Sequence, residues 1–201
     1  MSDQRYQTCP LVLRAESPGD AMNEILDQIG VGAGDEIAAD PENGIRYQEL
    51  FGVAPDLVIH YVEDDLTDDY AVFVTSSPDT ARQADELASV FTDQLEHWTL
   101  DELARAIDDA SDPREFAAAL ARAALGAPPV AHEALFRRFQ AGLRHSDPEV
   151  RNTAVFLTSR IGWPEFRLDL AEIAAGDESP ALRERARTIL QAYDAIGLGP
   201  R

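Results

Sequence analysis

Residues 145–151 read His-Ser-Asp-Pro-Glu-Val-Arg, and residues 176–183 repeat the theme as Gly-Asp-Glu-Ser-Pro-Ala-Leu-Arg. A fainter copy over residues 110–116 reads Ala-Ser-Asp-Pro-Arg-Glu-Phe. The prolines of the three copies are separated by 35 and 32 residues, a spacing typical of arrays of helical repeats. The second half of the chain is therefore expected to be an array of short helices.

Each copy has the parts of a helix start. A polar residue that can accept hydrogen bonds from free helix amides stands before the proline, and proline suits the first helical position, where its missing N–H costs nothing. The three pairs are Asp112-Pro113, Asp147-Pro148 and Ser179-Pro180. In the second and third copies, apolar residues then recur at helical spacing, whereas the first copy departs from this register.

These patterns resemble HEAT-like repeats, in which a proline opens the second helix of each pair and Val-Arg or Leu-Arg follows on its first turn. The resemblance covers about residues 100–197 and is closest at residues 147–151. It implies a short right-handed stack of helix pairs that presents a surface to partners. A generic bundle of proline-started helices is the alternative. The first helix of each pair is expected over residues 100–107, 135–143 and 166–173.

The first hundred residues show a different pattern and predict a small α+β domain over residues 1–98, followed by the repeats over residues 99–201. The expected strands cover residues 8–14, 57–62 and 70–75, and the expected helices cover residues 18–29 and 78–98. An acidic segment joins the last two strands and predicts a hairpin. The Gly- and Asp-rich residues 30–44 are expected to form a loop. The predicted fold class is therefore α+β, with a helical solenoid after the mixed domain.

Charge is distributed unevenly along the chain. The 17 basic residues are all arginine and face 37 acidic residues, which gives a net charge of −20. Residues 1–100 hold 21 acids and 4 arginines, a charge of −17, whereas residues 101–201 hold 16 acids and 13 arginines, a charge of −3. Such a field disfavours binding to nucleic acids and anionic membranes and attracts basic proteins. The alternative explanation is a composition bias of a high-GC or salt-adapted bacterium.

The location of the protein is predicted from what its sequence lacks. No apolar run approaches the ~20 residues that span a bilayer, and Met1 to Glu16 lacks the long hydrophobic region of a signal peptide. We therefore expect a cytoplasmic protein. The single cysteine, Cys9, excludes an internal disulfide and a cysteine-based metal cage, and no cofactor is expected.

Residues suited to catalysis or metal binding are sparse. The four histidines are scattered without the spacing that places two ligands on one helix face, so no catalytic residue is predicted. His60 lies within an expected strand and is interpreted as a packed, hydrogen-bonded side chain. The acidic turn offers oxygen ligands for calcium or magnesium, with a solvated turn as the alternative. These weak metal candidates are Asp64, Asp65, Asp68 and Asp69.

Arginines on the repeat helices form the remaining candidate site, because arginine is suited to forked contacts with carboxylates. Phe156 joins them as an interface anchor, because it lies outside the apolar stripe of its expected helix. The predicted partner-binding residues are Arg151, Phe156, Arg160, Arg183 and Arg187. The alternative is that these arginines pair with acids of the same helices, such as Asp147, Glu149 and Glu184.

The sequence thus favours a non-catalytic adaptor, scaffold or regulator that binds another protein through its helical repeats. A second hypothesis is an acidic inhibitor or immunity-type protein that neutralises a basic partner such as a toxin. A third is an enzyme with an unrecognised site in the first domain.

Overall fold

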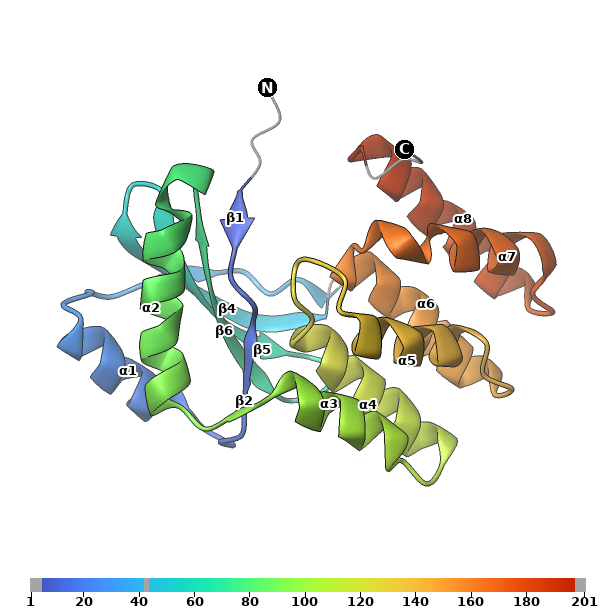
Figure 1. The fold of residues 1–201 in the computed structure, drawn as a ribbon, viewed down its shortest axis with the longest axis horizontal. Coiled ribbons are helices and arrows are strands. Elements are labelled where there is room, and N and C mark those ends of the chain that lie inside the picture. The colour runs from blue at the N-terminus through green and yellow to red at the C-terminus, as the bar shows by residue number, and fades with distance from the viewer. Residues whose placement is uncertain (1–4, 42–43, 198–201) are drawn as a thin grey trace. The chain divides into compact units, whose positions relative to one another are not determined.

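The computed structural model describes residues 5–41 and 44–197. The fold contains an antiparallel sheet and a set of helices and is α+β (Figure 1). The chain divides into two compact units, Met1–Thr99 and Leu100–Arg201, and the boundary expected from the sequence falls between residues 98 and 99.

The described part of the first unit contains a seven-stranded antiparallel sheet in the order β3-β4-β5-β6-β2-β7, with β1 also paired to β6. The strands are β1 (Tyr6–Gln7), β2 (Leu11–Leu13), β3 (Asp35–Ile37), β4 (Ile45–Ala54), β5 (Leu57–Asp64), β6 (Tyr70–Ser76) and β7 (His97–Trp98). The expected hairpin is confirmed, because β5 and β6 pair from Leu57↔Ser76 to Glu63↔Tyr70. Both strands lie inside the sheet, which explains why apolar residues occupy both of their faces.

Two helices, α1 (Gly19–Gln28) and α2 (Ala81–Gln94), pack on each other and on one face of the sheet (Figure 1). A short 3-10 helix, η2 (Pro78–Thr80), leads into α2. The core between these layers contains Met22 and Ile25 of α1, Phe91 of α2, and Ile59 and Val74 of the central strands. Alternate strand residues point to opposite faces, so one set from β5 and β6 fills this core.

The sequence misjudged several boundaries in the first unit. The strand predicted over residues 8–14 is reduced to Leu11–Leu13, and the predicted loop over residues 30–44 contains β3. The strand β4 was not anticipated at all. Strand β4 pairs with β3 on one side and with β5 on the other. Its apolar and polar residues do not alternate regularly, so the sequence reveals this long-range pairing only weakly.

The helix predicted over residues 78–98 ends at Gln94, because Leu95 adopts an extended backbone with φ −106° and ψ 134°. Phe91 and Leu95 lie in the core of the first unit. Trp98 belongs to β7 and pairs with Val12 of β2. The guanidinium of Arg14 lies 4.0 Å from the centre of the Trp98 ring, a cation–π contact within this unit.

The described part of the second unit is helical. Its elements are α3 (Leu100–Asp108), α4 (Pro113–Leu125), α5 (Glu133–Leu143), α6 (Pro148–Ile161), the 3-10 helix η3 (Pro164–Phe166), α7 (Arg167–Gly176) and α8 (Pro180–Ala195). The three helix starts predicted at the prolines are confirmed. Side chains of Asp112, Asp147 and Ser179 accept hydrogen bonds from backbone amides of the helices that they precede.

The helices of this unit pack as neighbours in two series. Helix α4 packs on α6 and α6 on α8, while α3, α5 and α7 each pack on the proline-started helix that follows them. Of the apolar residues that recur at helical spacing on α6 and α8, all but Ile161 are buried, including Val150, Leu157 and Leu182; Ile161, at the end of α6, is half-buried. At Gly142 of α5, a Cβ atom would lie 2.6 Å from Leu120 Cδ1, so glycine permits the close approach of α5 to α4.

An aromatic cluster centred on Trp163 joins several helices of the second unit. Gly162 ends α6 in the left-handed conformation, with φ 69°, as a C-terminal glycine commonly does. The next residue, Trp163, is fully buried and stacks on Phe166 with ring centres 5.5 Å apart. Its indole N–H donates to the Pro128 carbonyl at 2.8 Å, and Phe139 of α5 meets the ring edge-on. These contacts give Trp163 a structural role in the packing of the second unit.

Candidate partner-binding surface

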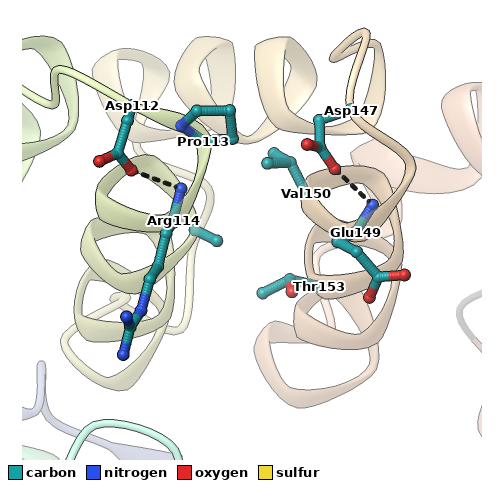
Figure 2. A pocket seen from close by; sticks show the side chains of 8 residues that line it. Asp112, Pro113, Arg114, Asp147, Glu149, Val150 and Thr153 are labelled. Atoms are coloured by element: carbon teal, nitrogen blue, oxygen red, sulfur yellow. Dashed lines mark hydrogen bonds between the residues drawn. The ribbon is translucent and has the colours of Figure 1, made fainter.

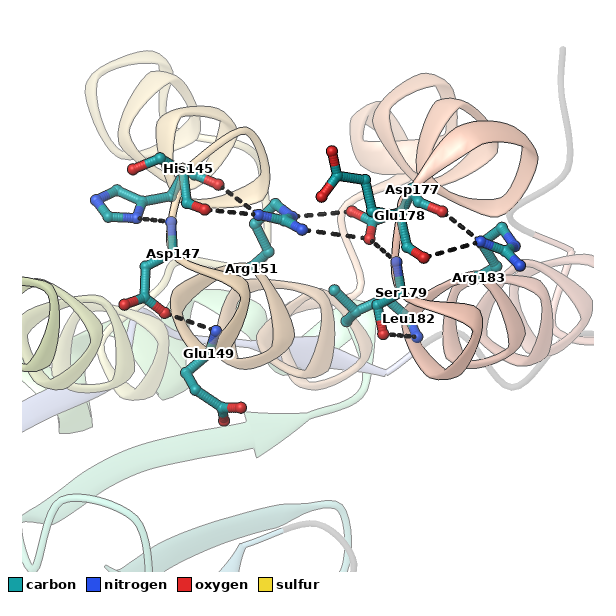
Figure 3. A network of polar contacts seen from close by, with 10 residues as sticks. His145, Asp147, Glu149, Arg151, Asp177, Glu178, Ser179, Leu182 and Arg183 are labelled. Atoms are coloured by element: carbon teal, nitrogen blue, oxygen red, sulfur yellow. Dashed lines mark hydrogen bonds and ion pairs between the residues drawn. The ribbon is translucent and has the colours of Figure 1, made fainter.

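Two arginines brace the turns that precede α6 and α8, and they do so in the same way (Figure 3). Arg151 Nη1 donates to the carbonyls of His145 and Ser146, at 2.9 and 3.1 Å. Arg183 Nη1 donates to the carbonyls of Asp177 and Glu178, at 2.5 and 3.3 Å. Each arginine follows its proline by three residues and reaches back over the helix start. The repeated sequence therefore produces a repeated side-chain geometry.

The rest of the Arg151 guanidinium binds the carboxylate of Asp177. Nε lies 2.9 Å from Oδ2 and Nη2 lies 3.3 Å from Oδ1, which makes a two-pronged contact between α6 and the turn before α8. The two side chains are only 13% and 7% exposed. The hydrogen bond from Arg151 holds the pKa of Asp177 below its usual range. The sequence identified the arginine but missed its acid, although both stand at fixed offsets from a proline.

The other predicted contacts lie elsewhere on the same helices. Phe156 is half-buried on α6, and Arg160, four residues later on the same helix, is also half-buried. Residues four apart share a helix face. Arg187 of α8 is exposed and contacts Glu184 at 3.0 Å and the carbonyl of Ala174 at 3.0 Å. Arg151 and Arg183 thus both contact Asp177, in the turn before α8. The other three predicted residues lie farther along α6 and α8.

A groove of about 420 Å³ lies between the first turns of α4 and α6 (Figure 2). The capping carboxylates of Asp112 and Asp147 stand at its rim, each bonded to an amide of its own helix. The residues that line it are Asp112, Pro113, Arg114, Ala117, Asp147, Glu149, Val150 and Thr153. The sequence did not predict this groove, because it requires the two capped helix starts to lie side by side.

A buried carboxylate also links α5 to α7. Asp169 is 3% exposed and accepts hydrogen bonds from Gln140 at 2.9 Å and from Arg144 at 2.6 Å. The sequence did not predict these two pairings, because the acceptor lies more than twenty residues away from each donor. This contact, like that of Arg151, stabilises the packing of neighbouring helices.

The acidic turn between β5 and β6 is organised by its own side chains. Asp64 is buried and its Oδ2 accepts hydrogen bonds from the amides of Leu66 and Thr67 and from the Thr67 hydroxyl. Arg46 of β4 contacts Glu63, Asp65 and Asp68 at 2.9, 3.1 and 2.6 Å. Within residues 5–41 and 44–197, no cluster of three or more His, Cys, Asp or Glu side chains could hold a metal ion. A guanidinium thus lies among the acids predicted as weak metal candidates.

His60 is a structural residue of the sheet, as the sequence predicted. Its ring stacks on Phe73 with centres 4.5 Å apart. The Gln48 amide donates to Nδ1 at 3.1 Å, which leaves the Nε2–H to donate to the Thr75 hydroxyl at 2.8 Å. Both contacts suit the neutral ring. Burial, helped by the positive charge of Arg5, lowers the pKa of His60 from 6.5 to about 4.

Comparison with known proteins adds no assignment. No family model, no curated protein and no solved structure matches this chain. Over the part of the chain that the structure describes, no helix is long and apolar enough to cross a membrane. The groove and the arginine-braced turns of the second unit are therefore the candidate features for binding.

Proposed function

We propose that this protein is a non-catalytic interaction protein whose residues 100–197 form a short HEAT-like solenoid that binds a partner protein. The observation that carries the proposal is the groove between α4 and α6. It lies between two helices with the same capped start, and its size suits one or two side chains of a partner segment. Interfaces gain most of their affinity where a few side chains fill such pockets.

The groove lining indicates which side chain it accepts. Its lining combines apolar groups, from Ala117, Val150 and the Thr153 methyl group, with three acids and Arg114. Each helix start contributes about +0.5 charge, so the rim remains negative by about one unit. A lysine or arginine suits this lining, because its aliphatic stem covers apolar surface while its charged head stays at the rim. Each buried methylene contributes roughly 0.8 kcal/mol.

The arginines and Phe156 complete the proposed surface. Arg151 is mostly occupied by Asp177, so its proposed role is to hold the turn that the partner meets. Phe156, Arg160, Arg183 and Arg187 remain the proposed contacts on α6 and α8. Aromatic and arginine side chains are enriched among residues that dominate binding energy, which supports this choice.

The second candidate is an acidic inhibitor that neutralises a basic protein through the first unit. The charge of −17 over residues 1–100 favours it, and so does the sharing of Arg46 among three acids. Attraction of this kind is screened over ~10 Å at 0.1 M salt. Its binding would therefore weaken steeply as salt rises.

Affinity capture from the native cell extract tests the proposal, with captured proteins identified by mass spectrometry. Thr153→Arg places a long cation in the groove, and Gln191→Arg makes the same change on an exposed position of α8. We expect a single partner in fixed stoichiometry that is retained by Gln191→Arg and lost by Thr153→Arg at unchanged salt.

Other outcomes favour the alternatives. If a basic partner is still captured by Thr153→Arg but elutes early in a salt gradient, the acidic-inhibitor hypothesis is favoured. If no protein is captured, the proposal fails. Native mass spectrometry of the purified chain then tests the enzyme hypothesis by searching for a bound small molecule or metal.

A further inference from the structure

The turns before α6 and α8 are built alike but differ in one contact. In both Arg151 and Arg183, Nη1 donates hydrogen bonds to the carbonyls that stand three and two residues before the proline of its own helix. Arg151 then uses Nε and Nη2 on Asp177. Arg183 has no acceptor for Nε or Nη2 among residues 5–41 and 44–197, and Figure 3 shows this edge of its guanidinium directed away from Asp177.

The carbonyl contacts fix the orientation of the open edge. An arginine held at one nitrogen by two carbonyls has lost much of its rotational freedom before any ligand arrives, so a ligand binds it at a lower entropic cost. Arg183 is half-buried in the first turn of α8, but its unbonded Nε and Nη2 are not buried, so the open edge is accessible to a ligand. Nearby Glu184 does not fill it, because that side chain contacts Arg187.

We infer that Arg183 is a docking site for a carboxylate of the partner protein, an aspartate or glutamate side chain that binds Nε and Nη2 as Asp177 binds Arg151. The inference rests on the proposed function, since the carboxylate belongs to the protein that the repeats bind. It assigns to Arg183 and Arg151 different roles: Arg151 holds the turn together, and Arg183 recognises the partner.

A second copy of this chain does not supply that acid by continuing the stack. Asp177 stands three residues before Pro180, and the corresponding residues of the earlier copies are Ala110 and His145. A phosphate-bearing partner is disfavoured because the chain carries a net charge of −20, which repels a polyanion more than a single carboxylate. The site therefore fits a protein with an acidic side chain in an exposed turn.

The direct test uses the full chain labelled with ¹⁵N and follows arginine Nε–Hε signals by NMR. The probe is an acetylated and amidated peptide that copies residues 175–181, the turn that presents Asp177 to Arg151. We expect a saturable shift of the Arg183 signal with a dissociation constant on the order of 10–100 mM. Arg183→Gln removes the responding signal and thereby assigns it, whereas Arg187→Gln, the matched change one turn later, leaves the shift intact.

Three results would overturn the inference. They are an equal response to the peptide carrying both Asp177→Asn and Glu178→Gln, a response spread evenly over the surface arginines, and a larger Arg183 shift with inorganic phosphate than with the peptide.

This experiment needs no natural partner, so it separates the two proposals. A peptide response without any captured partner upholds the carboxylate site and leaves the proposed function unsupported. A captured partner whose affinity falls about tenfold with Arg183→Gln, but not with Arg187→Gln, supports both. If a partner is captured and its affinity does not change with Arg183→Gln, the carboxylate site is refuted and the proposed interaction function is retained.

Discussion

The two units of this protein use arginine differently. In the first unit, Arg46 lies on an exposed hairpin and is shared by three nearby acids. In the second unit, the ion pairs Arg138–Asp108, Arg144–Asp169, Arg151–Asp177 and Arg167–Asp194 each connect different helices or the turns between them. Most of the net charge therefore lies in the first hundred residues, at −17 of −20. In the second unit, these four ion pairs contribute to the packing between helices.

Each unit contains one of the two tryptophans, which gives each its own fluorescence reporter. Trp98→Phe leaves Trp163 to report on the second unit, and Trp163→Phe leaves Trp98 to report on the first. Urea unfolding in these two backgrounds measures the free energy of unfolding at each reporter. The following variants test whether the units differ as described.

The largest effect is expected from Phe139→Ala, which disrupts the second unit without altering an arginine. Phe139 is 0% exposed and contacts Trp163 and Phe166 edge-on. Loss of a buried phenylalanine leaves a cavity and costs about 3–5 kcal/mol. Urea unfolding followed by Trp163 measures it. Val130→Ala is the control, because Val130 is 78% exposed; an equal loss there would show that the cluster has no special role.

Acid should act on the first unit through His60. The unfolded chain binds a proton near pH 6.5, whereas the folded His60 has a pKa of about 4. Because the unfolded state takes up the proton first, the free energy of unfolding falls as pH drops from 6.5 to 4, by up to about 3 kcal/mol. Unfolding followed by Trp98 at several pH values measures the slope. In His60→Gln the free energy of unfolding should depend less on pH over this range. An unchanged dependence would show that other titrating groups cause it.

Asp177→Asn tests the role of charge in the second unit. The change keeps the shape of the side chain but removes the charged acceptor of Arg151, whose side chain is 13% exposed. Hydrogen bonds to charged groups contribute about 2 kcal/mol, so we expect a loss of that size at the Trp163 reporter. Glu178→Gln, an exposed change at the next residue, should have little effect. Equal stability of the two variants would refute the structural role of the contact.

The smallest effect is expected from Arg46→Gln in the first unit. Arg46 is 44% exposed and its acids remain hydrated, so solvent replaces the lost contacts. The urea midpoint reported by Trp98 should not change measurably at 0.15 M salt. A loss as large as that of Asp177→Asn would remove the distinction between the two units.

The helix starts could be predicted from the sequence because they are local. The capping residue and the proline act on amides two or three residues away, and this information is contained in one short stretch. Strands β3 and β4 could not be predicted in the same way. Strand β3 is only three residues long, β4 lacks a regular alternation of apolar and polar residues, and β4 is held in the sheet by pairing with β3 and β5.

The candidate surface shows the same division. The sequence selected Arg151 and Arg183 as alike, because their positions relative to the prolines are identical. It could not show that Asp177 occupies one guanidinium and leaves the other open, since that depends on how α6 meets the turn before α8. The groove between α4 and α6 was missed for the same reason.

The contact between Arg151 and Asp177 limits how the helical half can change in length during evolution. One residue inserted into α7 would turn everything after it by 100° and move it 1.5 Å, which would take Asp177 away from Arg151. Deletions within α6 or α7 would have the same effect. Descendants of this gene should therefore lengthen or shorten by duplication or loss of entire helix pairs, with single-residue insertions confined to the loops.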